Sequence, residues 1–188
     1  MNVGFGTVVR VAVLVLVTVV IQLAVVTQIT VFDADADLFP LVVLSVGLLA
    51  GPIPGATAGF LLGLLADMAL LQTLGVTSLL LIAVGYLAGR YRELRDASHK
   101  LVPVIGAAIG TLVYGASFSL TQFLLGVESP VSPLVIREIV VGALLNALIA
   151  MPVYAACRRV LAPFLPDDPR RRRRRAYTTG GLSPLSRA

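Results

Sequence analysis

Asp67 is the residue of this sequence whose setting most strongly suggests chemistry, because it ends an apolar run, GPIPGATAGFLLGLLAD (51–67). A carboxylate in an apolar membrane segment is costly, and it indicates a hydrogen bond or ion pair with another helix, or a proton or cation site. Arg137, which opens a later apolar run, is the candidate ion-pair partner of Asp67. In the alternative interpretation, Asp67 reaches water, because the turn QTLG (72–75) follows soon after it.

A stripe of glycines runs along the same segment at Gly55, Gly59 and Gly63. Residues four apart lie on one face of a helix, and small residues there let a second helix approach closely in lipid. Each four-residue step drifts by ~40° on a 3.6-residue helix, so the stripe suits a crossing helix. GPIPG (51–55) is expected to form a turn before the helix, because proline disrupts helices. The same spacing recurs later, at Gly85 and Gly89 and at Gly106 and Gly110.

The sequence does not match the common enzyme templates. His99 is the only histidine, which excludes a His-based triad and a His-rich metal site. GPIPGATAG (51–59) lacks the lysine and the preceding strand of a phosphate-binding loop. We therefore predict no enzyme activity, no metal and no cofactor. Asn146 and Gln122 are polar residues deep in apolar segments, and each is expected to bond either across helices or to nearby backbone.

Composition predicts a membrane protein. Hydrophobic residues make up 57% of the 188 residues, and charged residues make up 13%, about half the usual ~25%. Mean hydropathy is +0.94. The apolar runs predict an all-α, polytopic bundle of about six transmembrane helices in one domain, 1–162. The expected segments are 8–31, 38–50, 54–71, 76–89, 101–125 and 134–160.

Two parts of this plan differ from a simple row of spans. The second segment would reach only ~20 Å, short of the ~30 Å hydrocarbon core. Segments 38–50 and 54–71 are therefore either two short spans or a re-entrant hairpin, and both options return the chain to the same side. Residues 163–188 are rich in Pro, Gly, Ser and Arg, which predicts a disordered basic tail.

The basic residues predict the orientation. Of the 15 lysines and arginines, all but Arg137 fall on one side of a six-segment plan. The positive-inside rule then places both termini in the cytoplasm of a multi-pass membrane protein. The tail arginines are expected to contact anionic lipids, with a simple topology signal as the alternative, and no nucleic acid is expected. These residues are Arg170, Arg171, Arg172, Arg173, Arg174 and Arg175.

One stretch resembles a known family. Residues 37–92 read DLFPLVVLSVGLLAGPIPGATAGFLLGLLADMALLQTLGVTSLLLIAVGYLAGRYR. An acidic residue with Leu before the second segment, then GFLLGLLAD, LG and VGYLAGR, resemble the bacterial rod shape-determining protein family MreD. The chain length and the number of spans also fit, whereas the arginine-rich tail is not part of the family pattern. By matching position, Gly59, Gly63, Asp67 and Gly75 carry that pattern.

The resemblance implies a non-enzymatic inner-membrane component of the lateral cell-wall synthesis machinery. Its implied partner is MreC, which connects it to RodA, a transpeptidase and, indirectly, MreB. The implied fold is similar to the substrate-binding subunits of energy-coupling-factor vitamin transporters. The glycines and Asp67 would then lie at helix-packing or partner interfaces, in a scaffold that docks partner helices.

The alternative function is a substrate-binding membrane subunit of a small-molecule transporter. A transporter needs polar groups that converge near the middle of the membrane. With no Trp and five Tyr, the sequence offers little such lining. The scaffold is therefore favoured over the transporter subunit.

Overall fold

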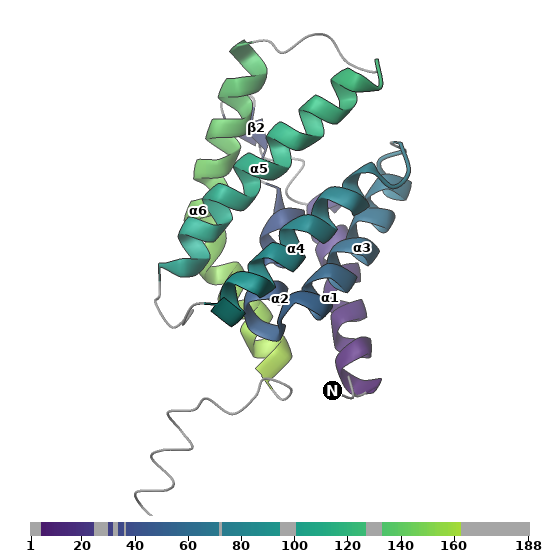
Figure 1. Cartoon of the computed structure of the whole chain (residues 1–188), viewed down its shortest axis with the longest axis vertical. Helices are drawn as coiled ribbons and strands as arrows, with labels where there is room; N and C mark the ends of the chain where they lie inside the picture. Colours follow the sequence, from purple (N-terminus) through teal and green to yellow (C-terminus); the bar gives the residue numbers. More distant parts are fainter. Residues whose placement is uncertain are drawn as a thin grey trace, which may run out of the picture.

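The computed structural model describes residues 5–24, 30–31, 34–35, 37–71, 73–94, 101–126 and 133–162 (Figure 1). In these ranges, a two-stranded antiparallel hairpin of β1 (Thr30–Val31) and β2 (Ala34–Asp35) accompanies the helices. The predicted all-α membrane bundle is confirmed, with this hairpin as a small addition. The helices are α1 (Phe5–Ala24), α2 (Leu38–Ala50), α3 (Pro52–Ala69), α4 (Val76–Leu94), α5 (Val102–Leu124) and α6 (Pro133–Leu161).

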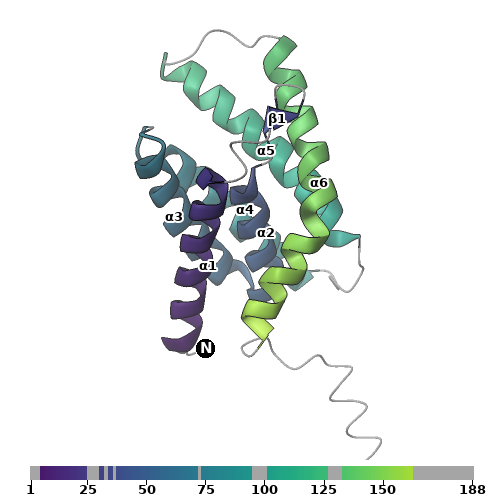
Figure 2. The same ribbon diagram turned by 180° about the vertical axis from the view of Figure 1, so that it is seen from behind.

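Helix α2 is the centre of the bundle. Every residue from Leu38 to Leu49 is buried, and α2 contacts each of the other five described helices. A helix that is apolar on all sides is expected to be enclosed in this way. In Figure 2, α1 crosses the back of the molecule beside α3, while α6 lies on the other side of α2. The short second segment is thus the core around which the longer helices pack.

Three described helices are long and apolar enough to cross a membrane: α3, α5 and α6. Helices α1 and α2 contribute shorter apolar stretches, and α2 with 13 residues is only ~20 Å long. Helices α2 and α3 form an antiparallel hairpin around Gly51, whose φ of 107° is in the region that favours glycine. The molecule is therefore a helical membrane bundle with a short, enclosed central helix.

Two predicted boundaries are wrong. Helix α1 ends at Ala24 and not at residue 31, and Thr30–Val31 forms a strand instead. Residues 25–31 are rich in β-branched side chains, which favour strands over helices. Helix α4 continues beyond Gly89 to Leu94. Its last turns carry arginines that extend the helix past the apolar region, and Arg90 pairs with Glu93 at 2.9 Å.

The predicted turn at GPIPG is shorter than expected. Helix α3 begins at Pro52, so both Pro52 and Pro54 lie in its first turn. Proline is tolerated there because the first-turn N–H groups have no partner within the helix. Gly55 is consequently the first glycine of the stripe that lies fully inside α3.

Candidate functional site: the glycine interface and the buried polar groups

The glycine stripe of α3 packs directly against α4, its most extensive helix partner. A Cβ atom added at Gly59 would collide with the backbone carbonyl of Leu81. A Cβ at Gly63 would lie 2.5 Å from the backbone nitrogen of Ser78. Real Cβ atoms do not approach backbone so closely, and only glycine permits this helix separation.

The glycines of α4 meet the beginning of α3 and the end of α2. A Cβ at Gly55 would lie 2.5 Å from the Gly85 carbonyl oxygen, and a Cβ at Gly89 would collide with Pro52. At Gly47 of α2, which sequence reasoning missed, an added Cβ would also lie 2.5 Å from the Gly85 carbonyl oxygen. Three helix backbones therefore meet around Gly85.

These contacts show which helix occupies the predicted groove. The stripe was expected to receive a crossing helix, and the structure fills it with α4 of the same chain. Gly55, Gly59 and Gly63 are all buried in this interface. A partner helix therefore has no direct access to them while α3 and α4 are packed.

Asp67 is buried and binds the turn that follows its helix. Asp67 is only 1% exposed, so its carboxylate does not reach water at the outer rim of the bundle. Its Oδ2 accepts a hydrogen bond of 2.7 Å from the backbone N–H of Gly75, just before α4 begins. Gly75 has a φ of 96°, which favours glycine. Asp67 and Gly75 thus join the end of α3 to the start of α4, while Asp67 Oδ1 has no hydrogen-bond partner among the residues that the structure describes.

The structure does not bring Asp67 and Arg137 together. No ion pair joins these two residues, both of which the structure describes. Arg137 is exposed near the start of α6, whereas Asp67 is buried near the end of α3. Asp67 was predicted to pair with Arg137, but it instead accepts a hydrogen bond from the backbone of the α3–α4 turn, which supplies a donor close to its carboxylate.

A second polar cluster holds the beginning of α2. The Asp37 N–H donates to Asn146 Oδ1 at 3.1 Å, and the Leu38 N–H donates to Gln22 Oε1 at 3.0 Å. The Phe39 N–H donates to the Asp37 side chain at 2.8 Å. Pro40 follows and has no N–H. All four donors that a helix start leaves unpaired are thus satisfied or absent, as an apolar surrounding requires.

Asn146 therefore bonds across helices, which was one of its two predicted arrangements. It is fully buried, and its Nδ2 donates to the Asp37 carbonyl oxygen at 2.8 Å and to Thr111 Oγ1 at 2.9 Å. Gln122 is also buried, but its Oε1 has no partner among the described residues. The role of Asp37 was missed, although an Asp directly before an apolar run is a typical helix N-cap.

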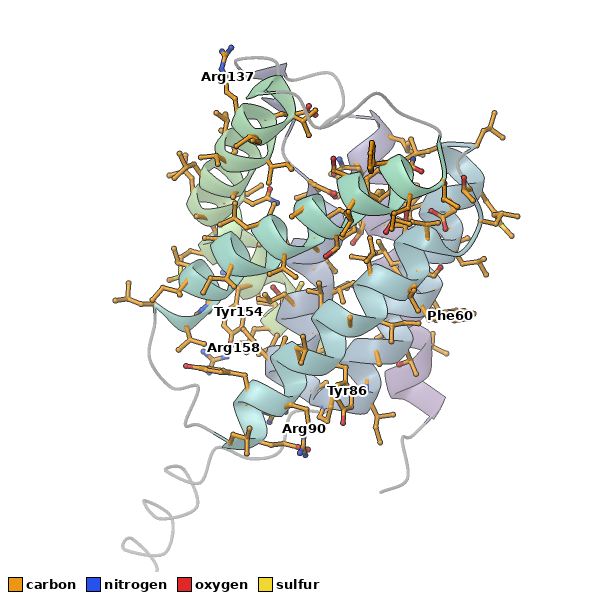
Figure 3. All side chains as sticks on the ribbon, turned by 45° about the horizontal axis from the view of Figure 1, so that its top comes forward. Phe60, Tyr86, Arg90, Arg137, Tyr154 and Arg158 are labelled. Atoms are coloured by element: carbon orange, nitrogen blue, oxygen red, sulfur yellow. The ribbon has the colours of Figure 1, made fainter. Side chains whose placement is uncertain are left out.

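Apart from Arg137, the arginines that the structure describes lie at one end of the bundle. Figure 3 shows Arg90 and Arg158 at the end opposite to Arg137. Arg10 belongs to the same end as Arg158, because it donates to the Val160 carbonyl oxygen at 3.3 Å. The tail arginines 170–175 lie outside the described residues. The charge separation expected from the sequence is therefore present in the described part of the fold.

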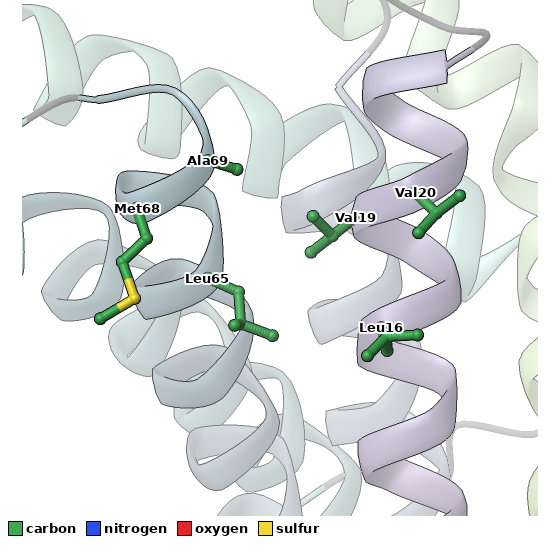
Figure 4. Close-up of a pocket in the computed structure, with 6 residues that line it drawn as sticks. All are labelled: Leu16, Val19, Val20, Leu65, Met68 and Ala69. Atoms are coloured by element: carbon green, nitrogen blue, oxygen red, sulfur yellow. The ribbon is translucent and has the colours of Figure 1, made fainter.

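An apolar groove lies between α1 and α3. It has a volume of about 360 Å³ and is lined only by aliphatic and methionine side chains (Figure 4). Such a groove offers contact to lipid or to apolar side chains, and it holds no group for acid, base or nucleophilic chemistry. Its lining residues are Leu16, Val19, Val20, Leu65, Met68 and Ala69.

Comparison with known proteins identifies one family. The family described as rod shape-determining protein MreD matches residues 5–160, which is most of the chain. No curated protein and no solved structure matches the chain. The match covers the glycine interface, Asp67, Gly75 and Asn146, and it confirms the resemblance drawn from residues 37–92.

Proposed function

Because the chain belongs to the MreD family of rod shape-determining membrane proteins, we propose that it is a non-enzymatic scaffold of the cell-wall elongation machinery. It docks MreC, and through MreC it connects to RodA, a transpeptidase and MreB. Family membership supports the role in cell shape. The tightly packed core of α2, α3 and α4 supports a rigid platform on which partners assemble.

The observation that carries the docking role is the uneven burial of the long helices. In the spanning windows, 39% of α3 is buried inside the chain, against 17% of α5 and 22% of α6. Most residues in these windows of α5 and α6 are therefore at least partly accessible to lipid or to a partner. In a bilayer, packing between such surfaces is what drives association of helices.

The outer part of α5 is the docking face that the geometry favours. The ends of α5 and α6 rise above the α3–α4 turn in both views (Figures 1 and 2). Leu120, Phe123 and Leu124 are exposed there, at 55%, 46% and 74%. Gln122 of the same turn is buried on the other side of the helix, and its Oε1 has no partner among the described residues.

The proposed orientation follows from the charges. The end that carries Arg10, Arg90 and Arg158 faces the cytoplasm, and Arg137 faces outward, as the positive-inside rule requires. The tail, 163–188, then lies in the cytoplasm, where its arginines contact anionic lipids of the inner leaflet. The outer part of α5 lies on the opposite side of the membrane.

Co-purification with MreC tests the proposal. Tagged wild-type protein is expected to recover MreC from a mild detergent extract, and Leu120→Trp is expected to lose it because the bulky ring disturbs the docking face. Val13→Trp is the matched control, since Val13 on α1 is 54% exposed and Leu120 is 55% exposed. Failure of the wild type to recover MreC would overturn the scaffold proposal. Equal recovery by both variants would overturn only the choice of face.

A further inference from the structure

A second apolar groove lies at the arginine-rich end of the bundle, between α2, α4 and α5. It has a volume of about 260 Å³. Leu44 and Leu48 of α2 line it together with Ala88 of α4. Gly106 and Gly110 of α5 line the other side, and their lack of side chains keeps the groove open.

The size of this groove selects its occupant. One turn of α-helix, ~5.4 Å long and ~10 Å across, fills roughly 400 Å³, which is more than the groove holds. A methylene group is about the size of a water molecule, so the groove has room for several methylene groups. A stretch of a single acyl chain has this size and apolar character, whereas a partner helix is too wide.

The groove has a cationic neighbour. Tyr154 packs against the hydrophobic cluster that contains Leu44, Leu48 and Ala88. Arg158, one turn further along α6, and Arg92 of α4 both act electrostatically on Tyr154. Figure 3 shows Tyr154 and Arg158 next to each other. Neither arginine forms an ion pair with a described residue, in contrast to Arg90, which pairs with Glu93.

We propose that this groove binds one acyl chain of an anionic phospholipid, with the phosphate on Arg92 and Arg158. Guanidinium groups bind phosphate through paired, charge-assisted hydrogen bonds, and the Tyr154 hydroxyl supplies a further donor. Basic sites between helices at the cytoplasmic side suit anionic headgroups. The assignment to the inner leaflet rests on the proposed orientation, whereas the site itself does not. It is separate from the arginine tail and from the face proposed for MreC.

Native mass spectrometry of the purified full chain tests the headgroup. The protein in detergent is offered dioleoylphosphatidylglycerol or dioleoylphosphatidylcholine, and it is expected to retain the anionic lipid preferentially. The double variant Arg92→Gln/Arg158→Gln is expected to bind phosphatidylglycerol roughly 30-fold more weakly, from the contribution of each cation near an anionic group. Arg90→Gln/Arg159→Gln removes the same charge from the same end and is expected to keep the wild-type preference.

A second set of variants tests the groove. Gly106→Leu fills it and is expected to reduce retention of both lipids, with Ile105→Trp as a second way to block it. Ala116→Leu adds the same bulk to α5 away from the groove and should leave retention unchanged. Thermal melting in detergent verifies that each variant is folded. Equal retention of the two lipids by the wild type, or wild-type retention by the Arg92/Arg158 variant or by both groove variants, would overturn the proposal.

Discussion

The side-chain amide of Asn146 holds the backbone of Asp37 from both sides. Its Oδ1 accepts from the Asp37 N–H at 3.1 Å, and its Nδ2 donates to the Asp37 carbonyl oxygen at 2.8 Å. These residues are 109 positions apart in the sequence. The pair attaches the start of α2 to α6 in a region where water is not available to replace the bonds.

Asn146→Leu is expected to destabilise the bundle strongly. The substitution keeps the branched shape of the side chain but leaves the Asp37 N–H and carbonyl unpaired, and each buried unpaired group costs about 1–3 kcal/mol. We expect a lower melting temperature in detergent by circular dichroism. Thr121→Val is the control, because among the described residues the Thr121 hydroxyl donates to the Ser117 carbonyl oxygen of its own helix, at 2.8 Å, and not to another helix. Equal melting of the two variants would contradict the assigned role of Asn146.

Gly63→Ala is expected to destabilise the packing of α3 against α4 by about 1–3 kcal/mol, the usual cost of overpacking. The added Cβ would lie 2.5 Å from the Ser78 backbone nitrogen, which cannot move without shifting α4. Gly106→Ala is the matched control, because its nearest neighbours are Leu44 side-chain atoms at 3.4 Å. Thermal melting in detergent compares the stability of the two variants. A larger loss of stability in Gly106→Ala than in Gly63→Ala would refute this account of the stripe.

The glycine stripe shows how far sequence reasoning reaches in this fold. Four-residue spacing places Gly55, Gly59 and Gly63 on one face whatever the rest of the chain does, so close packing was predictable. The identity of the partner was not, because any helix can fill such a groove and only the three-dimensional arrangement selects α4. The role of Gly47 was missed, although Gly47 precedes Gly51 by four residues and so continues the same spacing in the sequence.

The polar residues show the same limit. Asn146 and Asp67 were singled out because polar groups in apolar segments are costly, and both are buried. Their partners were not predictable. The donor to Asp67 is the Gly75 backbone, which no side-chain pattern reveals, and electrostatic reasoning favoured Arg137 instead. The helix bounds followed apolar patterning except at two ends: β-branched residues ended α1 early, and α4 continues past the apolar region to Leu94.

Asp67→Asn and Asp67→Leu are expected to differ in their effect on the stability of the protein. The asparagine retains a carbonyl oxygen that accepts from the Gly75 N–H. The Asp67→Asn variant is therefore expected to fold and to restore rod shape in a complementation assay. Leucine leaves that N–H unpaired beside the turn and is expected to cost about 1–3 kcal/mol. Melting in detergent measures the difference.

Arg137→Glu tests whether Asp67 acts through its hydrogen bond to backbone or through an ion pair with Arg137. Arg137 is exposed and makes no ion pair with Asp67, so the reversal is expected to change stability by less than about 0.5 kcal/mol. A large loss in Arg137→Glu that is restored by Asp67→Arg in the same chain would show that the two charges do pair.

Cysteine labelling in intact cells checks the orientation. Cys157 is the only cysteine of the chain and is 2% exposed. Its replacement by alanine therefore leaves no thiol that a membrane-impermeant maleimide could label. In that background, Glu128→Cys lies in the α5–α6 connection and is expected to react in intact cells, because the charge pattern places it outside. Ser183→Cys lies in the basic tail and is expected to react only after lysis. Labelling of Ser183→Cys before lysis would reverse the topology, and it would move the proposed phospholipid site to the outer leaflet.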